Sequence, residues 1–143
     1  MMTSMMTVFR PGGMADLAAV ESIQYQSPEA SHWNPREYLD HEFWVAMVDG
    51  VVAGFLVMRR VAADEGEILN LAVVPEFRRK RVAEGLFRVA LERFRGSVFL
   101  EVRESNNTAQ QFYKYLGFQV VSLRTSYYDT PPETAIVMKF HSC

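Results

Sequence analysis

Four consecutive cationic residues stand where a helix is expected to begin, and together they could hold a phosphate group. They follow a proline and the apolar run Ile68–Val74, which is typical of a buried strand. The helix after them is expected to extend to about Phe94. The unpaired N–H groups and the dipole of a helix N-terminus favour an anion such as a pyrophosphate. The residues are Arg78, Arg79, Lys80 and Arg81. The pattern therefore predicts a site for a phosphorylated cofactor, with a solvated basic surface as the alternative.

A second strand, turn and helix follow at Val98–Phe118 and carry two side chains that could move protons. The segment begins with β-branched and aromatic residues typical of a strand, with Glu101 among them. Asn106 is an N-cap type, Tyr113 falls on the apolar face of the helix, and Gly117 stands at its C-cap. A carboxylate and a phenol are candidates for a general base and a general acid. The alternatives are a solvent-facing glutamate and a core tyrosine.

These two blocks resemble the GCN5-related N-acetyltransferases, and within them the RimI-like ribosomal-protein-alanine N-acetyltransferase branch. The cofactor motif of that superfamily, [R/Q]-x-x-G-x-[G/A], is matched by Arg78–Ala83. The phrases L-E-V-R-x-S-N and N-x-x-A-x-x-x-Y-x-x-x-G-F are matched by Leu100–Asn106 and Asn106–Phe118. Paired tyrosines precede an apolar last strand, as in the branch. The resemblance covers roughly residues 66–140, and its motifs are specific only in combination.

The resemblance implies transfer of an acetyl group from acetyl-CoA to a primary amine, first of all the N-terminal α-amine of a protein. It implies that Glu101 takes a proton from the amine, directly or through water. Tyr113 would return a proton to the leaving thiolate, and the N–H of Val73 would stabilise the carbonyl oxygen. A small-molecule amine acetyltransferase and a non-catalytic acetyl-CoA-binding or interaction module are the alternatives.

The resemblance also implies two sets of binding residues. One set holds the cofactor, with the pantetheine arm added to the strand and the pyrophosphate at the helix start: Leu71, Ala72, Val73, Arg78, Arg79, Lys80, Arg81, Val82, Ala83 and Asn106. The other lines the acceptor site: Trp33, Asn70, Tyr127 and Tyr128. Asn106 as a helix cap, Trp33 as a core residue and the tyrosines as hairpin residues are the simpler interpretations.

Arg81 departs from the motif, because it stands at the position of the first glycine. In the family that glycine lets the backbone approach the pyrophosphate closely, since it has no side chain in the way. Arg81 could keep a helical backbone and turn its side chain outward. It could then contact the 3′-phosphate of CoA, or it could instead narrow the cradle.

The elements that must position these groups follow from periodicity and turn residues. A strand at Val8–Arg10 precedes a helix at Met14–Tyr25, whose residues Leu17, Val20, Ile23 and also Ala18 are expected to face inward. A short helix at Arg36–His41 leads to strands at Phe43–Val48 and Val51–Arg60, joined by the turn Asp49-Gly50, and a final hairpin ends the chain. The prediction is an α/β (α+β) fold: a central, mixed, mostly antiparallel sheet with helices on both faces. The resemblance adds that its central strands splay.

Composition limits the remaining possibilities. A chain of 143 residues is expected to form one domain, residues 1–143. The net charge of −2 does not favour nucleic acid or membrane surfaces, and no apolar run reaches the ~18 residues of a membrane span. The single cysteine, Cys143, and three scattered histidines predict no disulfide framework and no metal site, which suits the cytoplasm.

Overall fold

The computed structural model describes residues 6–26, 33–78, 81–129 and 132–142. Arg79 and Lys80, which are expected to bind the cofactor, lie outside the described residues. Contacts within the chain group into two compact units. The first comprises residues 1–60 and 68–93, and the second comprises residues 61–67 and 94–143.

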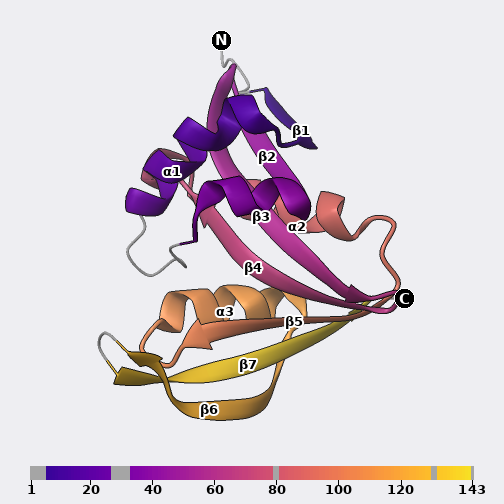
Figure 1. Ribbon diagram of the computed structural model, residues 1–143, viewed down its shortest axis with the longest axis vertical. Coiled ribbons are helices and arrows are strands. Elements are labelled where there is room, and N and C mark those ends of the chain that lie inside the picture. Colours follow the sequence, from indigo (N-terminus) through magenta and orange to yellow (C-terminus); the bar gives the residue numbers. More distant parts are fainter. Residues whose placement is uncertain (1–5, 27–32, 79–80, 130–131, 143) are drawn as a thin grey trace. The chain divides into compact units, whose positions relative to one another are not determined.

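The strands form one sheet in the order β1-β2-β3-β4-β5-β7-β6 (Figure 1). Their bounds are β1 Thr7–Pro11, β2 Glu42–Val48, β3 Val51–Ala62, β4 Glu65–Val73, β5 Gly96–Arg103, β6 Gln119–Asp129 and β7 Pro132–Ser142. The pairs β1–β2, β2–β3, β5–β7 and β6–β7 are antiparallel, and β4–β5 is parallel. The parallel register joins Glu65–Glu67 to Ser97–Phe99, three residues of each strand. The predicted mixed, mostly antiparallel sheet is confirmed.

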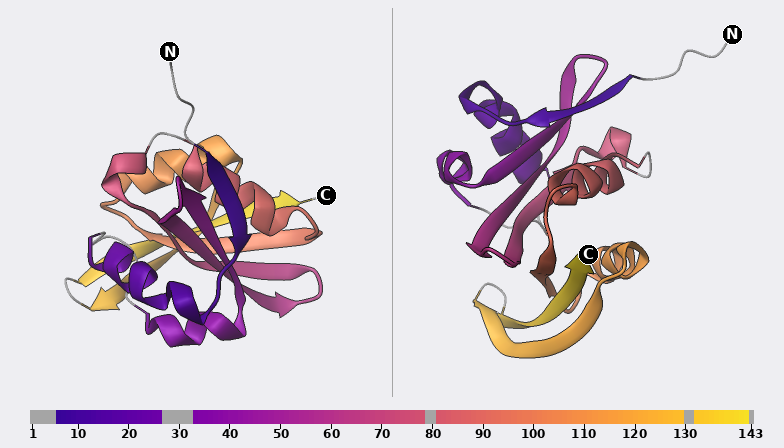
Figure 2. Two further views of the ribbon diagram at one scale, coloured as in Figure 1. Left: turned by 90° about the horizontal axis from the view of Figure 1, so that it is seen from above. Right: turned by 90° about the vertical axis from the view of Figure 1, so that its right-hand side faces the viewer.

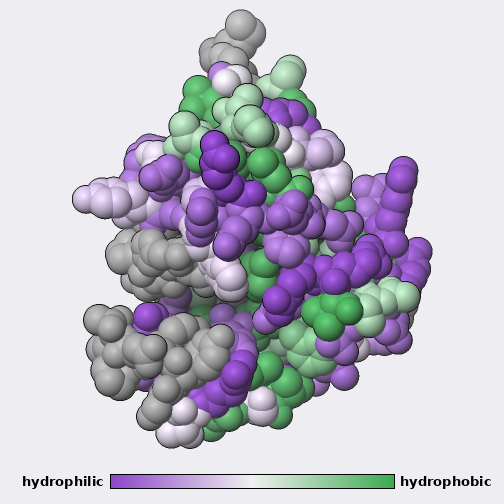
Figure 3. Space-filling view, in the orientation of Figure 1, coloured by the Kyte–Doolittle hydropathy of each residue, from purple (hydrophilic) through white to green (hydrophobic). Residues whose placement is uncertain are grey.

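Helices cover both faces of the sheet in the first unit (Figure 2). The helix α1 (Leu17–Tyr25), preceded by the single turn η1 (Met14–Asp16), and the 3₁₀ helix η2 (Pro35–Asp40) lie on one face. The helix α2 (Val82–Leu91) lies on the other and follows the short turn η3 (Pro75–Phe77). The charged residues of α1 and η2 face outward, as the hydrophilic surface over them in Figure 3 shows.

The core under α1 and η2 is built from the residues that periodicity predicted. Val20 and Ile23 are buried, and Leu17 packs against the same cluster, whereas Ala18 is exposed and its inward assignment was wrong. Their partners in this cluster are Tyr38, Phe43, Val45, Phe55, Val57 and Ala72. Strands β2, β3 and β4 thus present one apolar face to these two helices.

On the opposite face, α2 lies close to β1 because it carries a glycine at the contact. A Cβ built on Gly85 would lie 2.1 Å from Cζ of Phe9, far inside van der Waals contact. The missing side chain therefore lets α2 approach the strand, which fixes the position of the start of this helix within the unit.

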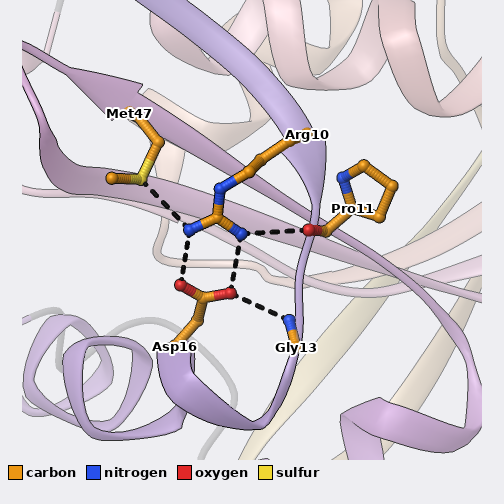
Figure 4. Close-up of polar contacts among 5 residues, drawn as sticks. All are labelled: Arg10, Pro11, Gly13, Asp16 and Met47. Carbon is orange, nitrogen blue, oxygen red and sulfur yellow. Dashed lines mark hydrogen bonds and ion pairs between the residues drawn. The ribbon is translucent and has the colours of Figure 1, made fainter.

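An ion pair holds β1 to the first helical turn (Figure 4). Arg10 donates from Nη1 to Oδ2 of Asp16 at 2.9 Å and from Nη2 to Oδ1 at 2.8 Å. The backbone N–H of Gly13 also donates to Asp16. The Arg10 guanidinium, helped by that N–H, lowers the pKa of the Asp16 carboxyl. The buried carboxylate is thus paired on both sides, as buried charges must be.

The second unit contains α3 (Asn107–Leu116), β5 and the hairpin of β6 and β7. Gly117 ends the helix in the left-handed region, at φ 111°, as predicted. Phe118 donates its N–H to the carbonyl of Tyr113 and packs its ring on Phe140, with the centroids 5.5 Å apart. The C-terminal end of α3 is thereby attached to β7.

Candidate functional site

Glu101 lies on β5 and forms an ion pair with an arginine that the sequence did not predict as its partner. Nη1 of Arg124, on β6, donates to Oε1 of Glu101 in a close ion pair. The register explains the pairing: Glu101 is opposite Val137 on β7, and Arg124 is opposite Ala135 on the same strand. The side chain of Glu101 is 17% exposed and that of Arg124 is 53% exposed. The carboxylate is therefore oriented by the guanidinium and still reaches solvent.

Tyr113 lies on α3 in the same unit, between two aromatic rings. Its centroid is 5.5 Å from that of Phe112 and 5.6 Å from that of Phe118, both in edge-on geometry. The residue as a whole is half-buried, and burial around its phenol raises the pKa of Tyr113 above its usual value. The hydroxyl therefore stays protonated throughout the neutral range and can serve as a proton donor.

Asn106 caps α3, which is the simpler of its two expected roles. Its Oδ1 accepts from the N–H of Ala109 at 3.1 Å. The turn before it is fixed by Glu133, which accepts from the N–H of Ser105 and from Arg103. The Ser105 hydrogen bonds, more than Arg103, lower the pKa of the Glu133 carboxyl.

The C-terminal end of β4 can offer a ligand its backbone more readily than its side chains. Ala72 and Val73 are both buried, and Leu71 is half-buried. The N–H of Leu71 donates to the side-chain oxygen of Asn70 at 3.0 Å, and that of Val74 donates to the carbonyl of Ala53. The Leu71 N–H is thus satisfied by a side chain of the same strand.

The start of α2 combines free helix N–H groups with exposed cations. Val82 is buried and Ala83 is half-buried, so both would meet an anion through backbone N–H groups. Arg78 is exposed and donates from Nε to the carbonyl of Val73 at 3.0 Å, which ties the turn to the end of β4. Arg81 is exposed and is the N-cap residue, with no side-chain cap hydrogen bond.

The backbone of Arg81 is left-handed, at φ 64° and ψ 16°, not helical as one alternative assumed. In this region the Cβ of an L-residue approaches the carbonyl oxygen that follows, which costs about 1–2 kcal/mol. Only glycine adopts the region without that cost. The structure therefore gives a second reason for a glycine at this motif position, namely the backbone turn itself.

Arg81→Gly is expected to raise the free energy of unfolding by about 1 kcal/mol, because it removes the Cβ from a left-handed residue. For a domain of this size that corresponds to a melting temperature about 3 °C higher. Thermal melts without ligand measure it, with Arg81→Ala as the control that loses the charge but keeps the Cβ. If both variants melt together, the backbone conformation carries no measurable strain.

The expected acceptor residues fall in both units. Trp33 is 42% exposed, and its carbonyl accepts from Nε2 of Gln24. Asn70 is 5% exposed and is hydrogen-bonded to Gln24 and Tyr38. Tyr127 and Tyr128 lie on β6, near the end of the hairpin, in agreement with their interpretation as hairpin residues. Their side chains are outside the part of the chain that the structure describes.

In the described parts of the chain, no group of three or more histidine, cysteine or acidic side chains could hold a metal ion. Among those same residues, no helix is both long and apolar enough to cross a membrane.

Known proteins resemble this chain in sequence and in fold. Residues 14–118 match the acetyltransferase (GNAT) family. The [ribosomal protein bS18]-alanine N-acetyltransferase of Salmonella typhimurium is 39% identical over 138 residues, which cover 86% of this chain and 89% of that protein. The crystal structure of Ard1 from Thermoplasma volcanium superposes with a TM-score of 0.85 at 30% identity, covering 96% of this chain and 98% of that one. Arabidopsis thaliana NAA60 in complex with acetyl-CoA has the same fold, with a TM-score of 0.81 at 20% identity over 95% of this chain and 98% of that one. The chain therefore belongs to the acetyltransferase (GNAT) family and is an N-acetyltransferase.

Proposed function

We propose that the protein transfers the acetyl group of acetyl-CoA to the N-terminal α-amine of another protein. The observation that carries the proposal is the 39% identity with an enzyme named for a ribosomal-protein alanine, over 86% of this chain. The similarity includes the segment in which Glu101 and Tyr113 stand. The proposed acceptor is a polypeptide N-terminus, and the chain is proposed to act as a single transferase domain in the cytoplasm.

The reaction needs a balanced exchange of protons. The amine nitrogen forms a bond to the thioester carbon, and the bond from that carbon to sulfur breaks. An α-amine has a pKa near ~8 and is largely protonated at neutral pH, so it must lose a proton before attack. Glu101, directly or through water, is the proposed base, and the Tyr113 hydroxyl is the proposed donor to the leaving sulfur.

Arg124 gives Glu101 a fixed orientation for this task. A carboxylate has two oxygens and about four lone-pair sites, so an arginine on Oε1 leaves Oε2 to accept from an amine or a water. A flexible glutamate would lose rotamer freedom when it met its substrate, whereas one already paired with a guanidinium has lost it in advance. The ion pair therefore supports a positioned base.

The cofactor would be held by backbone donors and by the cations around the start of α2. The pantetheine arm is proposed to add along Leu71–Val73, and the pyrophosphate to face the N–H groups of Val82 and Ala83. Arg81 adds a cation beside this polyanion. We favour contact of Arg81 with a phosphate over crowding of the cradle, because its side chain is exposed.

Turnover with acetyl-CoA and a panel of short peptides tests the proposal. Acetylated peptide and free CoA are expected in equal amounts, with faster turnover for free N-terminal α-amines than for N-terminally blocked peptides that carry a lysine. Acetyl-CoA is also expected to raise the melting temperature, since a ligand at a hundredfold excess over Kd stabilises the native state by about 2.7 kcal/mol.

Three outcomes separate the alternatives. Turnover of small amines with none of peptides would favour a small-molecule acetyltransferase. A melting shift without any turnover would favour a non-catalytic acetyl-CoA-binding module. No shift at millimolar acetyl-CoA would exclude both the cofactor site and the proposed reaction.

A further inference from the structure

Three buried polar side chains meet inside the apolar core of the first unit, and the reaction scheme uses none of them directly. Gln24 comes from α1, Tyr38 from η2 and Asn70 from β4. All three are at most 5% exposed. The ring of Tyr38 also packs against Phe43 and Phe55, with centroids 6.0 and 5.8 Å away. Polar groups are costly in such a place unless they are fully hydrogen-bonded, so this cluster needs an explanation.

Five hydrogen bonds of the cluster run in one direction. The N–H of Leu71 donates to Oδ1 of Asn70 at 3.0 Å. Nδ2 of Asn70 donates to Oε1 of Gln24 at 3.1 Å and to the hydroxyl of Tyr38 at 3.2 Å. That hydroxyl donates to the same oxygen of Gln24. Nε2 of Gln24 then donates to the carbonyl of Trp33 at 3.1 Å.

This direction fixes both amide side chains in one orientation. If Gln24 were turned over, its NH₂ group would face two donors and its oxygen would face the Trp33 carbonyl. If Asn70 were turned over, its NH₂ group would face the N–H of Leu71. Burial raises the pKa of Tyr38 to about 12, so its hydroxyl remains a donor at any pH at which the enzyme would be assayed. The chain of bonds is therefore a rigid link between two backbone groups.

The two ends of the link have opposite parts in the proposed reaction. One end is the N–H of Leu71, on the strand proposed to carry the pantetheine arm. The other is the carbonyl of Trp33, whose exposed ring is the expected wall of the acceptor site. Apolar packing alone would join α1, η2 and β4, but it would not specify the position of the Trp33 carbonyl.

We propose that Gln24, Tyr38 and Asn70 are positioning residues that set the place of Trp33 relative to β4 and thereby determine the affinity for the acceptor peptide. This inference rests on the proposed function. It assigns Asn70 an indirect role: its buried amide acts on the acceptor through Gln24 and Trp33, without touching it. The peptide KM should depend on the link, while kcat and the affinity for acetyl-CoA should not.

Two pairs of variants test the link. Gln24→Met keeps the side chain at nearly constant length and removes both the donor to Trp33 and the oxygen that accepts from Tyr38 and Asn70. Gln26→Met is its control at an exposed position two residues along the chain. Tyr38→Phe removes one hydroxyl and keeps the ring packing, and Tyr25→Phe is its control at an exposed position of α1. Kinetics with the best peptide give kcat and KM, titration gives the acetyl-CoA Kd, and thermal melts verify that each variant is folded.

Gln24→Met removes three hydrogen bonds, including the one to Trp33, and is expected to raise the peptide KM about tenfold. Tyr38→Phe removes two hydrogen bonds, neither of them to Trp33, and is expected to raise it about threefold. Both should keep kcat and the acetyl-CoA Kd within about twofold, and both controls should match the wild type. The inference fails if the two folded variants keep the wild-type peptide KM. It also fails if kcat, KM and Kd deteriorate together, since that pattern indicates general loosening. If the wild-type enzyme acetylates no peptide, the proposed function fails first, and the two failures are thus distinct.

Discussion

Tyr113→Phe is expected to lower kcat by roughly 10²–10⁴-fold, the usual contribution of a general acid. Loss of the hydroxyl removes the proposed proton donor to the leaving sulfur. The affinity for acetyl-CoA should stay near the wild-type value, because the phenylalanine ring keeps the edge-on contacts with Phe112 and Phe118. Steady-state kinetics with a saturating peptide, together with calorimetric titration of acetyl-CoA, measure the two quantities separately.

The raised pKa of Tyr113 also affects how kcat should depend on pH. A thiol has a pKa near ~8.5 and an ordinary phenol one near ~10, so complete transfer of the proton to a free thiolate is uphill. The raised pKa of the Tyr113 phenol makes this complete proton transfer still less favourable. Tyr113 should therefore pass its proton to the sulfur only as the carbon–sulfur bond breaks and not before, and its ionisation should cause no loss of activity up to pH 9.

The control for this variant lies on the same helix. Tyr115→Phe makes the same chemical change at a residue that is 70% exposed, and it should leave kcat unchanged. Equal losses in both variants would mean that α3 tolerates no such change, and full activity of Tyr113→Phe would remove the residue from the mechanism.

Local turn chemistry explains which parts of the fold were predictable. The Asp49-Gly50 turn has φ values of +50° and +84°, and Gly117 has a φ of +111°, conformations that these residue types favour over others. Between these turn and cap residues, a hydrophobic period of 3.6 residues predicts the helices and a period of 2 predicts the strands. These signals are local in the chain, so a single sequence contains them.

The left-handed backbone of Arg81 was not predictable from the same rules. An arginine favours a helical backbone, and nothing in its neighbours indicates a positive φ. The family motif with its glycine was the only signal available, and it was interpreted as a requirement for space. The structure adds the requirement for conformation, which the turn between η3 and α2 imposes.

The partners of the candidate residues were hidden because they are distant in the chain. Arg124 meets Glu101 only through the register that both strands share with β7. The sequence contains one weak local signal for Gln24: it follows Val20 by four residues and so falls on the buried face of α1. A polar residue at an inward position predicts a buried hydrogen bond, but its partners on η2 and β4 require the tertiary structure.

Glu101→Gln is expected to lower kcat/KM by roughly 10²–10³-fold at neutral pH and to recover part of that loss as the pH rises. The amide cannot accept the proton of an ammonium group. Above pH ~8 a growing share of the α-amine is already deprotonated, so the base is needed less. The ratio of wild-type to variant rates, measured from pH 6 to pH 9 with one peptide, reports this recovery independently of other ionisations.

Two comparisons decide whether Glu101 is a base or a substrate-holding residue. Glu104→Gln makes the same change at an exposed residue three positions later and should be silent at every pH. Loss of a holding contact would depress the rate by one factor across the whole range, without recovery. Near-wild-type turnover of Glu101→Gln from pH 6 to pH 9 would exclude Glu101 as the base, and a water held by backbone carbonyls would then be the remaining acceptor for the proton.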